Sequence, residues 1–497
     1  MRATMSTRPL RFFHRGEVVS LPAPPATRSV LDWLREDQHC TGTKEGCAEG
    51  DCGACTVVLG ELDAAGQLQL KPVNACIQFL PTLDGKALFT VEDLAQGEHL
   101  HPVQQAMVDC HGSQCGFCTP GFVMSLWAGY ERCAAGAPVP SRQQLADDLS
   151  GNLCRCTGYR PILDAGQQAF NAPRVALDRA PVVAALQALQ VEAQAQPLQT
   201  PNFHAPRTLT DFATLRAALP QARVLAGCTD IGLWVNKQFR DVGTLLYIAE
   251  VAELKAIHEE EGGLWIGAAA TLEAAWGALA EHWPSLREVG LRFASRPIRE
   301  AGTLGGNIAN GSPIGDGAPV LMALGADIEL CLGERVRRMP LADFYLDYMK
   351  NQLEPGEFVQ ALVVPLPKLG DSTAVRAYKI SKRFDCDISA VCAGLAVQLQ
   401  GGVVAQARFA FGGLAATVRH ARQAEAAVLG QPWTEATVQA AMAALAQDFT
   451  PLTDQRASAA YRLQVAQNLL LRLWLETRPD APLPPQATTV WAREVLA

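Results

Sequence analysis

Four cysteines in the first part of the chain have the spacing of an iron–sulfur ligand set. The stretch Cys47-Ala48-Glu49-Gly50-Asp51-Cys52-Gly53-Ala54-Cys55 is followed by a separate Cys76, and C-x4-C-x2-C with a distant fourth cysteine is the plant-type spacing for a 2Fe–2S cluster. Glycines at positions 46, 50 and 53 suit a loop around an inorganic core, which needs positive φ angles and close backbone approach. Four thiolates can also hold zinc, although structural zinc sites usually combine two separated C-x2-C pairs. The pattern therefore indicates an electron carrier, with zinc as the alternative.

A second group of four cysteines lies downstream. Its members are the C-x2-C pair Cys115 and Cys118 and the C-x-C pair Cys154 and Cys156. A proline two residues after Cys118 and apolar residues four apart predict a helix there, whose N-terminal dipole favours a thiolate. A second helix is expected from Ser141, where a capping box begins, and it leads to the C-x-C turn. A C-x2-C motif alone could be a thioredoxin-like redox pair, but no βαβ pattern surrounds it, and the matching C-x-C favours a second cluster.

Two segments around these cysteines resemble the molybdenum hydroxylase (xanthine oxidase) family. They are residues 113–121, SQCGFCTPG, and residues 151–159, GNLCRCTGY. In that family a plant-type domain is followed by a helical domain unique to it. The resemblance implies that both cysteine groups are 2Fe–2S ligands. It also implies that Gln114 reaches towards a molybdopterin that a partner chain holds.

Composition limits the location and the partners of the chain. The cysteines without a partner at ligand spacing are read as ordinary thiols; they are Cys40, Cys110, Cys133, Cys228, Cys331, Cys386 and Cys392. Fifteen cysteines, with eight assigned to iron, indicate a reducing compartment. Neither a signal-peptide core in the first 21 residues nor a membrane-spanning run is recognisable, so we expect a cytoplasmic chain without membrane contact. A net charge of −8 gives no basic surface for nucleic acid.

Two glycine-containing loops in the third region could hold the phosphates of a dinucleotide. In residues 224–232 a strand runs into a turn at Gly227, where successive N–H groups could cradle a pyrophosphate. Residues 302–310, GTLGGNIAN, form a second loop of this type. A βα turn with glycine is common, so the first loop alone could be purely structural. The chain has no G-x-G-x-x-G fingerprint, and a Rossmann site is therefore not supported.

Both loops resemble the FAD-binding segment of the same family, which has a fold distinct from the Rossmann type. The resemblance implies that the first loop contacts the pyrophosphate of the flavin through Val224, Leu225, Ala226, Gly227, Cys228, Thr229, Asp230 and Ile231. It implies that the second loop contacts phosphate and ribitol through Thr303, Leu304, Gly305, Gly306 and Asn307. Single contacts are implied for Phe293 with the isoalloxazine, for Asp316 on the adenosine side, and for Lys379. Phe293 could equally be a core aromatic. Gly306 is expected to adopt a positive φ, which a branched side chain would disfavour.

The expected fold class is multidomain α+β. The expected order is a plant-type 2Fe–2S ferredoxin-like domain (1–93), a four-helix 2Fe–2S domain (94–166), a linker with room for one helix (167–200), a non-Rossmann FAD-binding α+β domain (201–375) and a C-terminal flavoprotein α+β domain (376–490). Within the first domain we expect a hairpin over residues 10–21, a helix over 29–36 and strands over 56–59 and 69–73. In the last domain we expect a hairpin that turns at Gly401 and Gly402.

The fused order of cluster, cluster and flavin resembles the small subunit of the family's bacterial xanthine-oxidising members. No counterpart of the family's large molybdopterin domain follows residue 490, so we expect a larger molybdopterin-binding partner subunit, in a heterotetramer of two plus two. The resemblance implies electron flow from the partner's molybdenum through two 2Fe–2S clusters to FAD and then to NAD, with no catalytic acid or base in this chain. The alternatives are a subunit for aldehyde or N-heterocycle oxidation, a self-contained NADH-oxidising reductase, and a zinc-stabilised scaffold.

Overall fold

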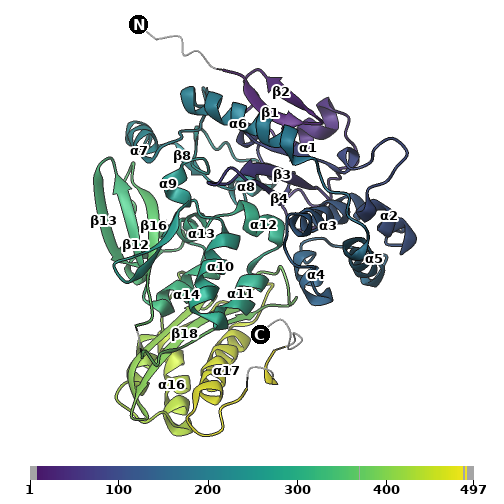
Figure 1. Cartoon of the computed structure of the whole chain (residues 1–497). Coiled ribbons are helices and arrows are strands. Elements are labelled where there is room, and N and C mark those ends of the chain that lie inside the picture. Colours follow the sequence, from purple (N-terminus) through teal and green to yellow (C-terminus); the bar gives the residue numbers. More distant parts are fainter. Residues whose placement is uncertain (1–7, 369, 485–486, 490–497) are drawn as a thin grey trace. The chain divides into compact units, whose positions relative to one another are not determined.

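The computed structural model describes residues 8–368, 370–484 and 487–489, and the predicted domain limits at residues 1 and 490 lie outside these ranges. The chain divides into two compact units, each discontinuous in sequence. Unit 1 contains the chain up to Phe212 together with Gln221–Val251 and Ser295–Gly302, and unit 2 contains Ala213–Pro220, Ala252–Ala294 and the chain from Thr303 onward. Both units combine helices with sheets (Figure 1), so the α+β fold class predicted from the sequence is confirmed.

Unit 1 begins with a five-stranded sheet in the order β2-β1-β5-β3-β4. Its strands are β1 (Leu10–His14), β2 (Glu17–Leu21), β3 (Thr56–Leu62), β4 (Leu68–Asn74) and β5 (Ala87–Phe89). The predicted hairpin over residues 10–21 is present, and the predicted helix forms as α1 (Val30–Asp32) and a π-helical turn (Trp33–Asp37). Thr56 pairs with Asn74 in the β3–β4 ladder. This pairing brings Cys55, just before β3, and Cys76, just after β4, to the same end of the sheet.

Helices follow the first sheet in unit 1. They are α2 (Pro102–Asp109), α3 (Thr119–Ala134), α4 (Arg142–Asp148), α5 (Arg160–Asn171) and α6 (Arg179–Ala195). As predicted, α3 begins directly after Cys118 and α4 begins at a capping box formed by Ser141. The segment predicted as a linker contains α6, whose Val182, Leu186 and Leu189 are buried in the same core as α3 and α5. The α6 segment therefore packs as an integral part of unit 1.

A second sheet completes unit 1, in the order β6-β7-β9-β8. The remaining elements are β6 (Gln199–Thr200), β7 (Phe203–His204), β8 (Arg223–Leu225), β9 (Leu245–Tyr247), α8 (Ile231–Gln238) and α12 (Arg296–Ala301), while α7 (Leu209–Ala218) is divided between the units. Lys86, which is 5% exposed, forms ion pairs with Glu61 at 2.7 Å and with Glu250 at 3.0 Å. Burial alone would lower the pKa of Lys86, but these carboxylates and the Tyr247 hydroxyl raise it well above its ordinary value. The buried charges that join the two sheets are thus paired.

Unit 2 contains an antiparallel sheet in the order β10-β11-β16-β12-β13 and a short two-stranded sheet, β14-β15. Its strands are β10 (Ile257–Glu260), β11 (Gly263–Gly267), β12 (Asp327–Leu332), β13 (Arg335–Pro340), β14 (Tyr345–Asp347), β15 (Lys350–Asn351) and β16 (Phe358–Pro365). The accompanying helices are α9 (Ala252–Lys255), α10 (Leu272–His282), α11 (Arg287–Phe293), α13 (Leu304–Asn310) and α14 (Gly317–Leu324). The eight residues of α14 are all buried, which places this helix in the centre of the unit's core.

The C-terminal part of unit 2 is a four-stranded antiparallel sheet with helices packed against it (Figure 1). Its elements are β17 (Ala374–Ile380), β18 (Val391–Gln400), β19 (Val403–Gly412), β20 (Arg419–His420), α15 (Arg422–Val428), α16 (Glu435–Asp448) and α17 (Ala459–Thr477). The predicted hairpin is present as β18 and β19. Gly401 and Gly402 have φ angles of 58° and 81°, as a two-residue hairpin turn with φ above zero at both centres requires.

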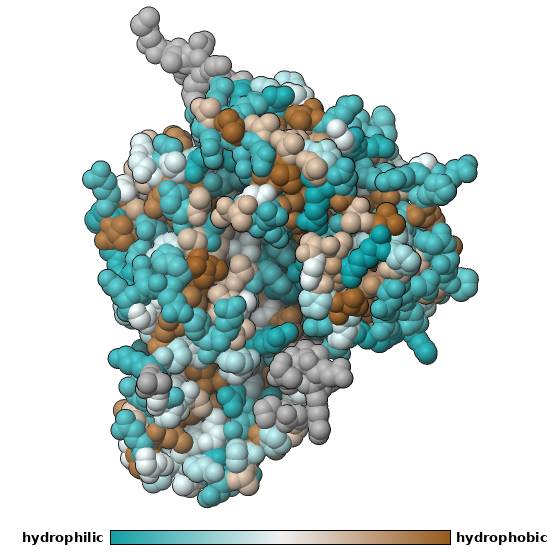
Figure 2. All heavy atoms as spheres, viewed as in Figure 1, coloured by the Kyte–Doolittle hydropathy of each residue, from teal (hydrophilic) through white to brown (hydrophobic). Residues whose placement is uncertain are grey.

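The surface of the described chain is mixed in polarity. On the face shown in Figure 2, hydrophobic side chains form small, separate patches among hydrophilic ones. Within the described ranges, none of the helices has the length and hydropathy needed to cross a membrane.

Candidate functional site

The thiols of the plant-type group lie within hydrogen-bonding reach of one another in unit 1. Hydrogen bonds from the thiols of Cys52 and Cys76 lower the pKa of Cys47 far below its ordinary value. A further hydrogen bond from Cys76 lowers the pKa of Cys55, and the pKa values of the donors Cys52 and Cys76 are raised in turn. The structure therefore brings together the four sulfur atoms that the sequence grouped by spacing.

The loop that carries three of these thiols uses its glycines as predicted. Gly50 and Gly53 have φ angles of 78° and 69°, and Ala48 also has a positive φ, of 55°. A Cβ atom on Gly46 would lie 2.7 Å from the sulfur of Cys52. Close approach of backbone to sulfur is thus built into the loop, which fits a cluster wrapped by main chain.

The second cysteine group also converges, as two pairs. A hydrogen bond from Cys118 to Cys154 joins one pair, and a hydrogen bond between Cys115 and Cys156 joins the other. The helix dipole at the start of α3 favours a thiolate at Cys118, but other effects oppose it. Burial and the bond to Cys154 raise the pKa of Cys118 to about 12 and outweigh the position at the start of α3.

The helical-domain group is arranged in a way that suits a two-iron cluster. A 2Fe–2S cluster takes two protein ligands on each iron, so it needs cysteines in pairs. The two thiol pairs of the helical-domain group, Cys118 with Cys154 and Cys115 with Cys156, are the arrangement that a binuclear cluster requires.

The two cysteine loops are interlocked through Asn152, a residue that motif spacing did not single out. Its amide nitrogen donates to the carbonyl oxygen of Gly53 at 3.1 Å and to the hydroxyl of Thr56 at 3.2 Å, while its amide oxygen accepts from Ser125 at 2.6 Å. Asn152 is 2% exposed. Beside it, the N–H of Leu153 donates to the carbonyl oxygen of Cys52 at 3.0 Å. One backbone hydrogen bond therefore links Cys52 directly to the residue before Cys154.

The first glycine loop connects β8 to α8 in unit 1. A Cβ atom on Gly227 would lie 1.7 Å from the carbonyl oxygen of Ala301, so only glycine fits at this position. The positive φ of the loop belongs to Cys228, at 63°, and burial raises the pKa of that thiol to about 12. Ala226, Gly227 and Thr229 remain partly exposed.

The second glycine loop forms the start of α13 in unit 2. The Thr303 hydroxyl accepts a hydrogen bond from the N–H of Gly306 at 3.1 Å. Gly306 lies in the first helical turn and lacks the positive φ expected for it. A Cβ atom on Gly306 would lie 2.9 Å from Thr303 Oγ1, and one on Gly305 would lie 2.5 Å from the Cα of Ala268, so the steric need for glycine is stronger at Gly305. The side-chain oxygen of Asn307 is buried without a hydrogen-bond donor in the described structure, which fits a site for an added ligand.

Asp316 and Lys379 form a closed network in unit 2. Lys379 Nζ lies 2.5 Å from Asp316 Oδ2 and donates to Ser389 Oγ at 2.9 Å, and the Ser389 hydroxyl donates to Asp316 Oδ1 at 2.6 Å. All three side chains are buried. Asp316 directly precedes Gly317, where a Cβ atom would lie 2.5 Å from Asn307 Oδ1. The network thus supports the wall next to Asn307, with its own polar groups already paired.

Phe293 packs against Trp276, with ring centroids 5.7 Å apart. Its side chain is only partly buried at the edge of the unit 2 core. Both interpretations of Phe293 made from the sequence, core aromatic and flavin neighbour, are compatible with this position.

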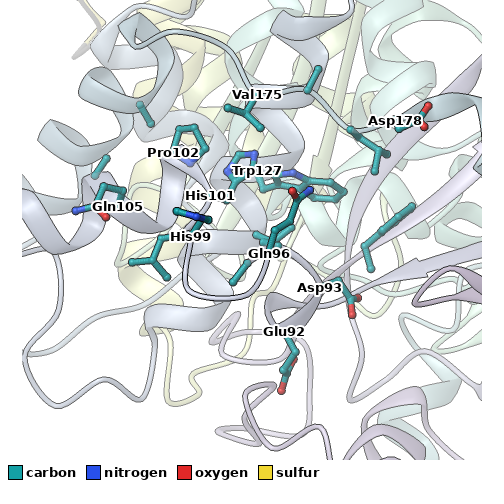
Figure 3. Close-up of a pocket in the computed structure, with 18 of the residues that line it drawn as sticks. Glu92, Asp93, Gln96, His99, His101, Pro102, Gln105, Trp127, Val175 and Asp178 are labelled. Atoms are coloured by element: carbon teal, nitrogen blue, oxygen red, sulfur yellow. The ribbon is translucent and has the colours of Figure 1, made fainter.

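A pocket of about 860 Å³ lies in unit 1 near Trp127 and His101 (Figure 3). His101 Nδ1 accepts a hydrogen bond from the N–H of Val103 at 3.2 Å, and burial lowers the pKa of this histidine. No residue predicted to bind a cluster or the flavin lines the pocket. The candidate cofactor sites therefore lie elsewhere.

The packing of Gly227 leads to a prediction for Gly227→Ala. The added methyl group collides with the main chain of Ala301, which cannot move aside as a flexible side chain would. We expect a loss of about 1–3 kcal/mol in stability and less bound flavin, with iron content retained, measured by unfolding and by cofactor absorbance. Gly277→Ala, where nothing lies within 4 Å of the added atom, is the control and should keep its flavin. Full flavin binding in folded Gly227→Ala would contradict the role of this loop.

Models of four domain families match the chain. They are the 2Fe-2S iron-sulfur cluster binding domain (residues 12–79), the [2Fe-2S] binding domain (90–167), the FAD binding domain in molybdopterin dehydrogenase (196–367) and the CO dehydrogenase flavoprotein C-terminal domain (376–477). The chain therefore carries two 2Fe–2S-binding domains and an FAD-binding domain. The family resemblance seen in the cysteine motifs is confirmed.

Individual relatives agree with these matches. Xanthine dehydrogenase of Drosophila subobscura is 33% identical over 491 residues, which cover 86% of this chain and 36% of the relative. Aldehyde oxidase 4 of Cavia porcellus is 30% identical over 487 residues, which cover 86% of this chain and 36% of the relative. The chain thus spans a little over a third of the length of these relatives.

Reconstituted CO dehydrogenase from Oligotropha carboxidovorans is similar in structure, with 28% identity and a TM-score of 0.52 over 55% of this chain and 96% of the other. The chain belongs to the molybdenum hydroxylase family, of which it carries the iron–sulfur and flavin-binding domains.

Proposed function

We propose that this chain is the electron-transfer subunit of an NAD-dependent xanthine dehydrogenase. The observation that carries the proposal is the interlock of the two cysteine loops, where the N–H of Leu153 donates to the carbonyl of Cys52 at 3.0 Å. Two clusters held by loops in direct contact suit one-electron transfer between them. A bound flavin supplies the conversion between one-electron and two-electron chemistry that reduction of NAD requires.

The exposure of the cysteines supports a direction for the electrons. Two thiols of the helical-domain group, Cys115 and Cys156, are exposed, although its Cys154 is buried. None of the plant-type thiols is exposed: Cys55 and Cys76 are buried, and Cys47 and Cys52 are half-buried. Gln114 is exposed beside Cys115, and Phe117 is 46% exposed although it is apolar. In this proposal the helical-domain group, which has the two exposed thiols, faces a larger molybdopterin-binding subunit and receives electrons from it. The plant-type group passes them on to the flavin.

The choice of a purine substrate rests on the relatives and on domain order. Proteins named xanthine dehydrogenase from insects, plants and rat match nearly the whole of this chain. We extend this to oxidation of hypoxanthine and xanthine to urate by a cytoplasmic heterotetramer of two plus two. The second candidate is a subunit for oxidation of aldehydes, N-heterocycles or carbon monoxide, because aldehyde oxidase and CO dehydrogenase are also among the relatives.

The test of this function uses the chain together with the molybdenum subunit that co-purifies with it. We expect that complex to reduce NAD with hypoxanthine or xanthine as the electron donor, and to do so much faster than with aldehydes, N-heterocycles or carbon monoxide. The measurement is NADH formation by absorbance. Turnover with one of the other donors but none with purines would replace this proposal by the second candidate.

Cluster assignment is tested by Cys115→Ser, which removes one thiol from the exposed pair with Cys156. We expect one of two sets of paramagnetic signals to disappear or change while the other stays, because the plant-type group does not include this residue. Low-temperature EPR spectroscopy of the reduced protein is the measurement. Cys110→Ser, outside both groups, should leave both sets in place. Two unchanged sets in Cys115→Ser would exclude this residue as a ligand.

Partner docking is tested by Gln114→Ala. Gln114 is exposed, and a contact from its amide to the partner's molybdopterin would be lost in the variant. We expect iron, FAD and NADH-to-dye activity to stay, while purine-to-NAD turnover falls several-fold, in line with the loss of one hydrogen bond of about 1 kcal/mol. The exposed glutamine of Gln187→Ala, on α6, serves as the control. An equal loss of both activities would point to general destabilisation.

A further inference from the structure

The helix that leaves the first glycine loop lies directly against the plant-type cysteine group. Gly232 and Asn236 of α8 are four residues apart, so they share one face of the helix. A Cβ atom on Gly232 would lie 2.6 Å from the carbonyl oxygen of Ile77 and 2.8 Å from its Cβ. The absence of a side chain at this point lets α8 approach the residue next to Cys76. All of these residues belong to unit 1.

Asn236 bridges the two separate segments that supply the plant-type thiols. Its amide nitrogen donates to the carbonyl oxygen of Cys76 at 2.8 Å and to that of Ala48 at 3.2 Å. Cys76 carries one thiol of the group itself, and Ala48 directly follows Cys47 in the other segment. The side-chain amide has two N–H donors, and both are used here. One side chain of α8 therefore holds the two ends of the ligand set together.

The ion pair next to Asn236 is a weaker contact than the hydrogen bonds of its amide. Lys237 lies 3.9 Å from Glu49, and both side chains are 44% exposed. Exposed ion pairs of this geometry contribute little. The amide of Asn236 is thus the specific link between α8 and the cysteine loop, and a search of motif spacing could not find it because 160 residues separate it from Cys76.

We propose that Asn236 is a positioning residue that also tunes the reduction potential of the plant-type cluster, an inference that rests on the proposed electron-transfer function. Reduction adds negative charge to a cluster, and hydrogen bonds around it help to set its potential. The N–H groups of Asn236 direct their positive ends at the main chain that carries two ligands. They stabilise the reduced state and hold Cys47 and Cys76 in place against α8.

The test compares two variants of similar size in the complete protein. Asn236→Leu removes both donors, and Asn236→Asp also places a carboxylate against two carbonyl oxygens. We expect the potential of the plant-type cluster to become more negative in the order wild type, Leu, Asp. The potential of the helical-domain cluster should not change and serves as the internal reference. Redox titration followed by EPR spectroscopy measures both, with the signals assigned by Cys76→Ser and Cys115→Ser.

Control variants separate this role from general damage. Gln238→Ala changes an exposed residue at the end of the same helix and should alter neither potential. If the Leu and Asp variants do not fold, Asn236→Ala removes the same donors with a residue that favours helix, and the same negative shift is expected. Unchanged potentials, or equal shifts of both clusters, would overturn the inference.

Failure of the cluster assignment and failure of the role of Asn236 give different results. Persistence of both signals in Cys76→Ser would remove the cluster assignment itself. Normal assignment with no effect at Asn236 would reject only the role of this side chain. Selective loss of the plant-type signal in a folded Asn236 variant would support the positioning role directly.

Discussion

The contact of three glycines holds the iron–sulfur part of the chain together. A Cβ atom on Gly121 would lie 2.1 Å from the carbonyl oxygen of Gly53, and one on Gly53 would lie 2.3 Å from the carbonyl oxygen of Gly151. No side chain fits at these positions, so main chain packs on main chain where the two cysteine loops meet. Asn152 then satisfies the polar groups that this contact buries. The start of α3, the C-x-C turn and the start of β3 all depend on this arrangement.

Local patterns predicted much of the fold. Cysteine spacing, the cap at Ser141, the start of α3 and the glycine turn at 401–402 each depend on residues within a few positions of one another. Contacts across the sequence escaped prediction: Asn152 reaches Gly53 over 99 residues and Asn236 reaches Cys76 over 160. Two expectations drawn from local sequence were outweighed by the local structure. Helical geometry overrode the expected positive φ of Gly306, and burial overrode the dipole at Cys118.

The residue types in the segments expected to bind the flavin predicted only part of what the structure shows there. Glycine is required at 227 and 305 because backbone lies where a side chain would be, which the sequence could signal only as a glycine of unknown purpose. Asp316 and Lys379 were grouped by family resemblance, and the structure pairs them with each other through Ser389. That third member carried no motif, since a serine in a loop has many ordinary roles.

The discontinuity of unit 1 has a consequence for how genes of this family can be divided. Residues 221–251 and 295–302 belong with the iron–sulfur domains, through contacts such as Arg296 with Asp148 at 2.5 Å and Lys86 with Glu250 at 3.0 Å. In the CO dehydrogenase structure, by contrast, a chain that corresponds to 55% of this one is a separate polypeptide. A gene break near residue 200 would turn these internal contacts into a subunit interface made of partly buried ion pairs and glycine-backbone packing. In a split arrangement these contacts would form only when the two chains meet, so covalent fusion removes an assembly step that a split arrangement must complete with every copy.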